Sequence, residues 1–151
     1  MDSSSMLSRV IRAARLDPTL YHEIEHDASL NREALMVVIF VSLLSAVSAL
    51  IAGLIMGSLG AALLGALLAV VSGIVGYYIW SYLTWFIGTR LFNGTAEPGE
   101  LLRSLGYAYG VQALGVFSFI PCVGVFISLA AAIWALVAGI IAVREALNFD
   151  T

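Results

Sequence analysis

The sequence predicts an all-α integral membrane protein: four transmembrane helices, arranged as two hairpins, follow a short N-terminal amphipathic helix. Of the 151 residues, 61% are hydrophobic and only 11% are charged, whereas a soluble domain has about 25% charged residues. The mean hydropathy is +0.99. Two long stretches, Ala34–Thr89 and Ser104–Val143, contain no charged residue and no histidine. Each is long enough for two spans of about 20 residues, and too little polar surface remains to cover a water-soluble fold.

The first hairpin is divided by the short turn MGSLG at Met56–Gly60. This division predicts one span over Ala34–Ile55 and a second over Ala61–Leu91. The second helix would be about 46 Å long at 1.5 Å per residue, against about 30 Å of hydrocarbon. It must therefore tilt, kink at its central glycines or project from the bilayer. Its aromatic end, YYIWSYLTWF at Tyr77–Phe86, favours projection, because Tyr and Trp prefer the membrane interface.

The second hairpin is divided by IPCVG at Ile120–Gly124. The third span must begin near Glu100 and continue to Phe119 in order to cross the bilayer, and the fourth covers Val125–Val143. Thr95 is the expected N-cap of the helix that leads into the third span, with Glu97 in its first turn, where a negative charge suits the helix dipole.

The arginines predict the orientation. Both hairpin turns are uncharged, while the arginines lie near the termini and around the segment that joins the hairpins. Because positive residues stay cytoplasmic, we expect both termini in the cytoplasm. The chain then divides into a cytoplasmic segment (1–33), a four-helix transmembrane domain (34–147) and a short tail (148–151). The arginines are Arg9, Arg12, Arg15, Arg32, Arg90, Arg103 and Arg144.

The N-terminal segment contains MLSRVIRAARL, in which apolar residues recur at helical spacing. This pattern predicts a short helix lying on an anionic membrane surface. The alternative is a frayed tail with chance spacing. The apolar face comprises Leu7, Val10, Ile11 and Ala14, and the remaining positions include Arg9, Arg12 and Arg15.

Small residues spaced by four predict where helices approach closely within the bilayer. The first span has the row Ser45, Ala49, Gly53 and Gly57, and the second has Ala61, Gly65, Ala69 and Gly73. The third adds Gly106 and Gly110, and the fourth adds Ala131, Ala135 and Gly139. Intramolecular packing explains most of these rows, and homo-oligomerisation through one of them is the alternative.

The stretch His22-Glu23-Ile24-Glu25-His26 matches the zinc-peptidase motif H-E-x-x-H. That chemistry needs a third ligand and a dry cleft. The sequence has no third histidine, an acidic residue occupies the motif's interior, and nearly all remaining residues belong to the membrane. We therefore interpret His22 and His26 as part of a solvated acidic stretch and expect neither a metal nor a cofactor.

Three blocks of sequence resemble one family when taken in order. They are YHEIEHDASLNREALMVV (Tyr21–Val38), GTRLFNGTAEPGELLRSLGYAYGVQAL (Gly88–Leu114) and IWALVAGIIAVREAL (Ile133–Leu147). Together they resemble prokaryotic members of the Yip family, the membrane proteins named as Ypt-interacting proteins. The resemblance implies that motif positions are occupied by Glu23, Asp27, Arg103, Gly106, Tyr107 and Arg144.

Eukaryotic members of this family are multi-span Golgi and endoplasmic reticulum proteins that bind Rab-type GTPases through a long cytosolic N-terminal region. Here that region is only about 33 residues long. The resemblance therefore implies a membrane location, expected to be the cytoplasmic membrane of a prokaryote, more directly than GTPase binding.

The function predicted from these observations is that of a non-catalytic scaffold or adaptor. Its partners would be the lipid bilayer and a cytoplasmic or membrane protein that contacts the six motif positions, with homo-oligomerisation also open and no nucleic acid. The alternative is a small oligomeric channel or permeability protein lined by Gln112 and serines. A zinc peptidase is the remote third reading.

Overall fold

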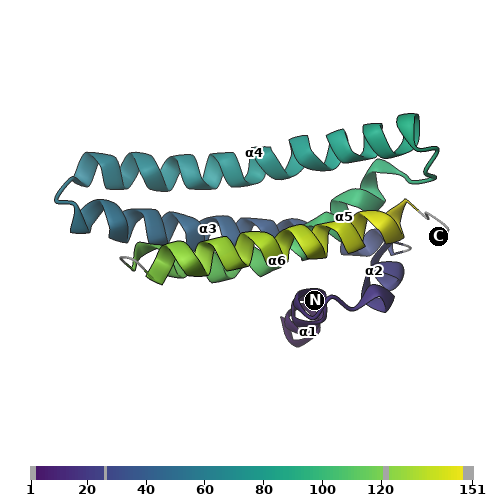
Figure 1. Ribbon diagram of the computed structural model, residues 1–151, viewed down its shortest axis with the longest axis horizontal. Helices are drawn as coiled ribbons and strands as arrows, with labels where there is room; N and C mark the ends of the chain where they lie inside the picture. Colours follow the sequence, from purple (N-terminus) through teal and green to yellow (C-terminus); the bar gives the residue numbers. More distant parts are fainter. Residues whose placement is uncertain (1–2, 26, 121–122, 148–151) are drawn as a thin grey trace.

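The computed structural model describes residues 3–25, 27–120 and 123–147, and this part of the chain is helical without strands. The all-α prediction is therefore confirmed. The elements in chain order are α1 (Ser3–Ala14), α2 (Pro18–Glu25), η1 (Ala28–Leu30), α3 (Asn31–Ile55), α4 (Leu59–Leu91), α5 (Pro98–Tyr109), η2 (Gly110–Phe119) and α6 (Val123–Ala146). The long helices α3, α4 and α6 run along one axis, while α2 lies toward the end of the bundle that carries the C-terminus and α1 lies beside the bundle, closer to its middle (Figure 1).

Three helical segments in the described residues are long and apolar enough to cross a membrane: Ala28–Ile55, Leu59–Leu91 and Val123–Ala146. They correspond to the predicted first, second and fourth spans. The predicted third span is not one continuous α-helix, because the chain changes at Gly110 from the α-helix α5 to the 3₁₀-helix η2. At 1.5 and 2.0 Å per residue, α5 rises about 18 Å and η2 about 20 Å.

The turn between α3 and α4 forms where the sequence predicted it. Gly57 has φ +72°, a left-handed conformation that glycine adopts without steric cost. Ser58 is the N-cap of α4 and accepts a hydrogen bond from the Ala61 amide at 3.3 Å. From there α4 continues as one helix to Leu91 through both central glycines.

The N-terminus of α5 differs from the prediction by two residues. Glu97, and not Thr95, is the N-cap, and Pro98 is the first helical residue. Its φ is already suited to that position. The Glu97 amide donates to the Glu100 carboxylate at 2.9 Å, one half of a reciprocal capping box.

The small-residue rows explain the contact between α3 and α4. A Cβ added at Gly53 would lie 2.7 Å from the Cβ of Ala62, and one at Gly65 would lie 3.6 Å from the Cβ of Ala49. Gly73 faces Ser42 in the same way. Two predicted members lie outside the contact. Gly57 is in the turn with open space around its Cβ position, and Ala61 is exposed while its neighbour Ala62 is fully buried.

The segment α5–η2 runs parallel to α3, and glycines again allow the approach. A Cβ at Gly106 would lie 2.9 Å from Ala34 Cβ, and one at Gly110 would lie 3.3 Å from Val37 Cγ1. Further along, the hydroxyls of Ser48 and Ser118 share a hydrogen bond of 2.7 Å.

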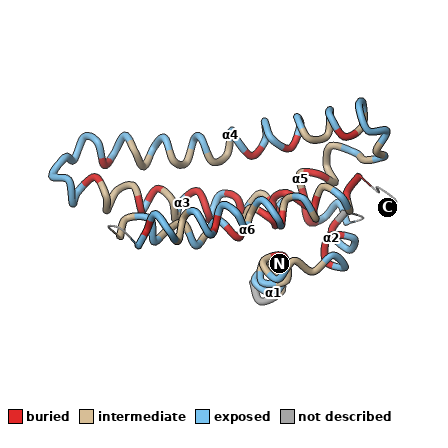
Figure 2. The backbone as a smooth tube through the Cα atoms, in the orientation of Figure 1, coloured by how far each residue is buried: buried red, intermediate tan, exposed pale blue. Residues whose placement is uncertain are grey.

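Burial is uneven across the molecule. Buried residues concentrate in α3, α5 and the neighbouring faces of α2 and α6, whereas most of α4 is exposed (Figure 2). The exposed side chains of α4 are large and apolar, for example Leu67 at 61% and Trp80 at 61% exposure. A continuous apolar surface of this kind is rare on a soluble monomer and suits contact with lipid.

Candidate functional site

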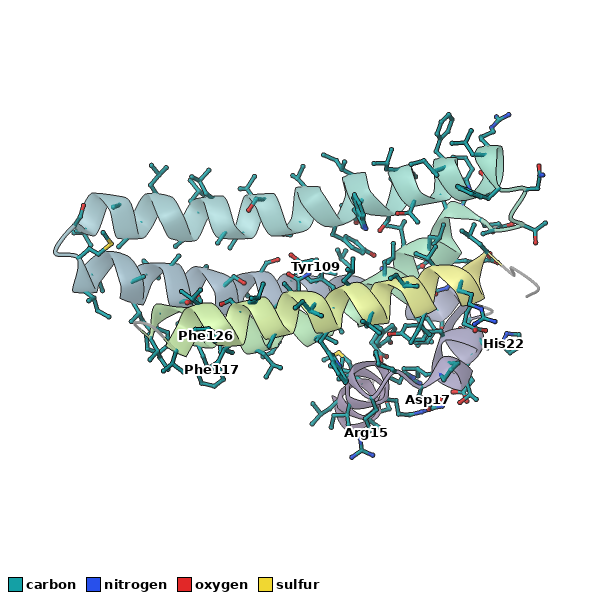
Figure 3. All side chains as sticks on the ribbon, viewed as in Figure 1. Arg15, Asp17, His22, Tyr109, Phe117 and Phe126 are labelled. Atoms are coloured by element: carbon teal, nitrogen blue, oxygen red, sulfur yellow. The ribbon has the colours of Figure 1, made fainter. Side chains whose placement is uncertain are left out.

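The ionisable side chains of the described chain gather at one end of the bundle. We call this end the charged cap and define it as residues 3–25, 27–33, 88–107 and 143–147. It contains all seven arginines and the described acidic residues. The opposite end, where α3 joins α4 and α6 begins, carries exposed apolar side chains such as Phe117 and Phe126 (Figure 3).

A buried carboxylate, Glu33, lies at the centre of the charged cap. Its Oε1 accepts a hydrogen bond from the Arg9 guanidinium at 2.7 Å and a second from the Tyr107 hydroxyl at 2.6 Å. The Glu33 side chain is 9% exposed and Tyr107 is fully buried. The bond to Glu33 raises the pKa of Arg9 above its ordinary value. One carboxylate thus joins α1, α3 and α5.

Arg103 is a second buried charged residue, 6% exposed, and it binds the end of α2 to α5. Its Nε donates to the Ile24 carbonyl at 3.0 Å, and its Nη1 donates to the Asn31 side-chain oxygen at 3.2 Å. One helical turn later, Gly106 packs against Ala34. This close approach of α5 to α3 brings the next residue, Tyr107, within reach of Glu33.

The reversal between α1 and α2 is organised around Arg12. Leu16 adopts a left-handed φ of 61° at the turn. The Arg12 guanidinium binds the carboxylates of Asp17 at 2.8 Å and Glu23 at 2.9 Å. Hydrogen bonds from Thr19 and then Arg12 lower the pKa of Asp17, and the bond from Arg12 lowers the pKa of Glu23. Both carboxylates are therefore ionised at neutral pH.

In the structure, α2 and the end of α1 pack against the bundle. Leu20, Tyr21 and Ile24 of α2 are fully buried against the bundle. The Trp134 indole of α6 donates to the Ala14 carbonyl at the end of α1, at 2.7 Å. On α1 itself, Val10 packs near Gly110, so the predicted apolar face is divided between the bundle and the outside.

The outer part of that face remains exposed, at 59% for Leu7 and 43% for Ile11. These two side chains are available to a membrane surface.

The zinc-motif residues do not form a described metal site. His22 lies on the exposed side of α2 and points away from the bundle (Figure 3). His26 lies outside the described residues. Among the residues that the structure describes, no group of three or more histidine, cysteine or acidic side chains is close enough to hold a metal ion.

The six motif positions fall into two groups. Arg103, Gly106 and Tyr107 are buried inside the charged cap. The exposed group comprises Glu23, Asp27 and Arg144. Asp27 caps η1 by accepting hydrogen bonds from the amide and hydroxyl of Ser29, which lower its pKa.

The sequence reading missed Glu33, Arg9 and Arg12 as members of this network. Glu33 is the last charged residue before the first uncharged stretch. The position of this carboxylate at the start of an apolar helix could have indicated that Glu33 is buried and binds a partner side chain.

A groove lies between α4 and α6, with α5 and the start of η2 at its base. Its volume is about 740 Å³. It exists because α4 packs on α3 and α5 and makes little contact with α6. Tyr109 and Gln112 line its base (Figure 3 labels Tyr109), and Arg144 lines one end.

The comparisons with known proteins agree with this architecture. The family model described as the Yip1 domain matches residues 16–151. No curated protein matches the chain, and no solved structure matches it. Because the family model covers everything from the α1–α2 turn to the last residue, the chain belongs to the Yip1 domain family of membrane proteins.

Proposed function

We propose that this Yip1 domain protein is a non-catalytic membrane adaptor, and that the exposed part of its charged cap is the surface that binds a partner. The observation that carries the proposal is the division of the six motif positions. Arg103, Gly106 and Tyr107 are occupied by intramolecular contacts, so their role is to hold the cap in shape. Glu23, Asp27 and Arg144 are exposed, although Glu23 also binds Arg12 and Asp27 also caps η1, and they form the proposed contact positions.

We propose four membrane crossings. The long helices α3, α4 and α6 provide three. The segment α5–η2 provides the fourth, because its combined rise of about 38 Å exceeds about 30 Å of hydrocarbon although neither part does so alone. The hydrogen bond between Ser48 and Ser118 supports this path, since it joins η2 to the half of α3 that is remote from the cap.

The charged cap is proposed to face the cytoplasm. Its seven arginines and the uncharged opposite end fit the rule that positive residues stay on the cytoplasmic side. The membrane would be the cytoplasmic membrane of a prokaryote. In this orientation α1 lies at the membrane surface, with the exposed Leu7 and Ile11 directed toward lipid. The helix then has the interfacial role expected from its sequence while it is also attached to the bundle.

The adaptor proposal is tested by site-specific photo-crosslinking in cells of the source organism. A photoreactive phenylalanine analogue replaces Glu23 or Asp27 in the cap, and replaces Phe126 at the opposite end as the control. We expect a protein adduct from the cap positions and none from Phe126. The adduct should be lost when Asp27→Lys is combined with the analogue at position 23. Adducts at all positions or at none contradict the proposal.

The channel alternative has one supporting observation. Ser72, Ser81 and Gln112 line the same groove. The serines of α3 do not share it: Ser45 bonds to its own helix at the Val41 carbonyl, and Ser48 bonds to Ser118. Ion and glycerol flux into liposomes that contain the purified protein tests this alternative. Flux that falls with Gln112→Leu supports a pore, and flux equal to that of empty liposomes removes it.

A further inference from the structure

We propose that the groove between α4 and α6 binds the acyl chain of an anionic phospholipid from the adjacent leaflet, with the lipid phosphate at Arg144. This inference does not depend on the adaptor proposal. It rests on the size, position and polarity of the groove and on one unpartnered hydroxyl within it.

The dimensions fit one leaflet. The lining residues extend over Ser72–Thr84 on α4 and over Ala132–Arg144 on α6. Each range rises about 18 Å, close to half of about 30 Å of hydrocarbon plus the start of the headgroup layer. The groove ends at the charged cap, so its depth corresponds to the leaflet on that side.

The charged residue of the lining, Arg144, lies at the cap end of the groove, where a lipid headgroup would lie, while the uncharged polar residues Ser72 and Gln112 line the groove farther from the cap. The lining is predominantly apolar and small, with Gly76 and Gly139 among its residues. Arginine binds phosphate through several donors in a fixed geometry. Basic residues at the membrane boundary also attract anionic lipids.

The Ser81 hydroxyl is a further indication of a bound molecule. Ser81 is 1% exposed, it lines the groove, and its oxygen has no hydrogen-bond partner among the described residues. A buried hydroxyl without a partner is unfavourable. Rotation of the Ser81 side chain toward the groove would let an ester or glycerol oxygen of a lipid near the headgroup level provide the missing bond.

The groove has the size of a small-molecule site, at about 740 Å³. The volume is within the range of 300–1,000 Å³ that is typical of small-molecule sites.

The test uses the full chain, stripped of lipid in detergent and titrated with dioleoyl-phosphatidylglycerol or dioleoyl-phosphatidylcholine in native mass spectrometry. Gly76→Leu fills the groove without a clash, because a Cβ at Gly76 meets no atom within 4 Å. Gly60→Leu is the matched control on the same helix, outside the groove and equally unobstructed. Arg144→Gln removes the charge.

The unsubstituted protein is expected to bind the phosphatidylglycerol in preference. Gly76→Leu should weaken the binding of both lipids by about tenfold or more, and Gly60→Leu should weaken the binding of neither. Arg144→Gln should abolish only the preference for phosphatidylglycerol. Equal lipid binding by the Gly76→Leu and Gly60→Leu variants overturns the proposal. If the protein is a dimer that dissociates in the Gly76→Leu variant while lipid binding is unchanged, the groove belongs to a second copy of the chain. That result also overturns the proposal.

A second measurement applies even if Gly76→Leu fails to fold. Trp80 lines the groove, and the Trp85→Phe/Trp134→Phe variant leaves it as the sole tryptophan. In detergent, brominated phosphatidylglycerol should quench its fluorescence saturably, and unlabelled phosphatidylglycerol should reverse the quenching better than phosphatidylcholine does. Quenching that is linear with lipid and insensitive to the headgroup contradicts a specific site.

Discussion

Replacing Glu33 tests the buried network on which the charged cap depends. In Glu33→Leu, the Tyr107 hydroxyl loses its acceptor in a position with no access to water. An unsatisfied buried hydroxyl costs about 1–3 kcal/mol. The Arg9 side chain is 30% exposed and can be hydrated after the change, so its contribution is at most about 1 kcal/mol. The free energy of unfolding should therefore fall by about 1–4 kcal/mol.

The partner substitution sharpens this prediction. Tyr107→Phe leaves Glu33 bound to Arg9 and should cost only about 1–1.5 kcal/mol. In the double variant no unsatisfied hydroxyl remains and only the bond to Arg9 is lost. The loss in the double variant should therefore fall short of the sum of the two single losses by at least about 2 kcal/mol. The assay is a titration with sodium dodecyl sulfate in bicelles, followed by far-ultraviolet circular dichroism. Strict additivity, or a Glu33→Leu variant as stable as the original, would refute the reasoning.

Three other predictions concern the hairpin, the α1–α2 corner and the docking of α1. Gly53→Leu should lower the free energy of unfolding by about 1–3 kcal/mol through overpacking against Ala62; Gly60→Leu, the unobstructed control, should not. Since the pKa values of Asp17 and Glu23 are lowered from 3.8 and 4.5, the corner is stabilised above those values and loses this contribution as the pH falls through the lowered ones. The protection factors of the α1 amides, which correct for the intrinsic pH dependence of exchange, should therefore fall below about pH 4. Arg12→Gln should have low protection factors without this pH dependence, and protection factors that stay constant in the unsubstituted protein contradict the pairing. Trp134→Phe removes the bond to the Ala14 carbonyl and should accelerate exchange in α1 but not in the middle of α3; equal effects in both helices would show a global change instead.

The long spans were predictable because lipid solvation leaves a coarse signal. A long stretch without charges indicates spans in hydrocarbon, and the turn at Met56–Gly60 divides the first such stretch into two helices. The contact between α3 and α4 was also largely predictable, because only small residues allow two backbones to approach so closely. The one-residue difference between Ala61 and Ala62 reflects the exact rotation of α4, which a spacing of four does not specify.

The 3₁₀ conformation of η2 was not predictable in the same way. Its sequence, GVQALGVFSF, is as apolar as the α-helical spans, and hydropathy does not distinguish 1.5 from 2.0 Å of rise per residue. The network of the cap depends on pairs such as Glu33 with Tyr107, which are 74 residues apart. Such pairs follow from the tertiary arrangement and not from local sequence. For this reason the sequence predicted Arg103, Gly106 and Tyr107 as residues that contact a partner, whereas the structure buries them.

The most direct test of the account is the sidedness of three positions in the membrane. Single cysteines replace Thr95 in the cap, Gly60 at the opposite end and Ile120 after η2, each in a Cys122→Ser background, and are labelled in intact cells with a membrane-impermeant maleimide. Four crossings with a cytoplasmic cap predict that positions 60 and 120 react from outside, and that position 95 reacts only after the membrane is opened. Labelling of position 60 without position 120 would show that α5–η2 does not cross, and labelling of position 95 in intact cells would reverse the orientation.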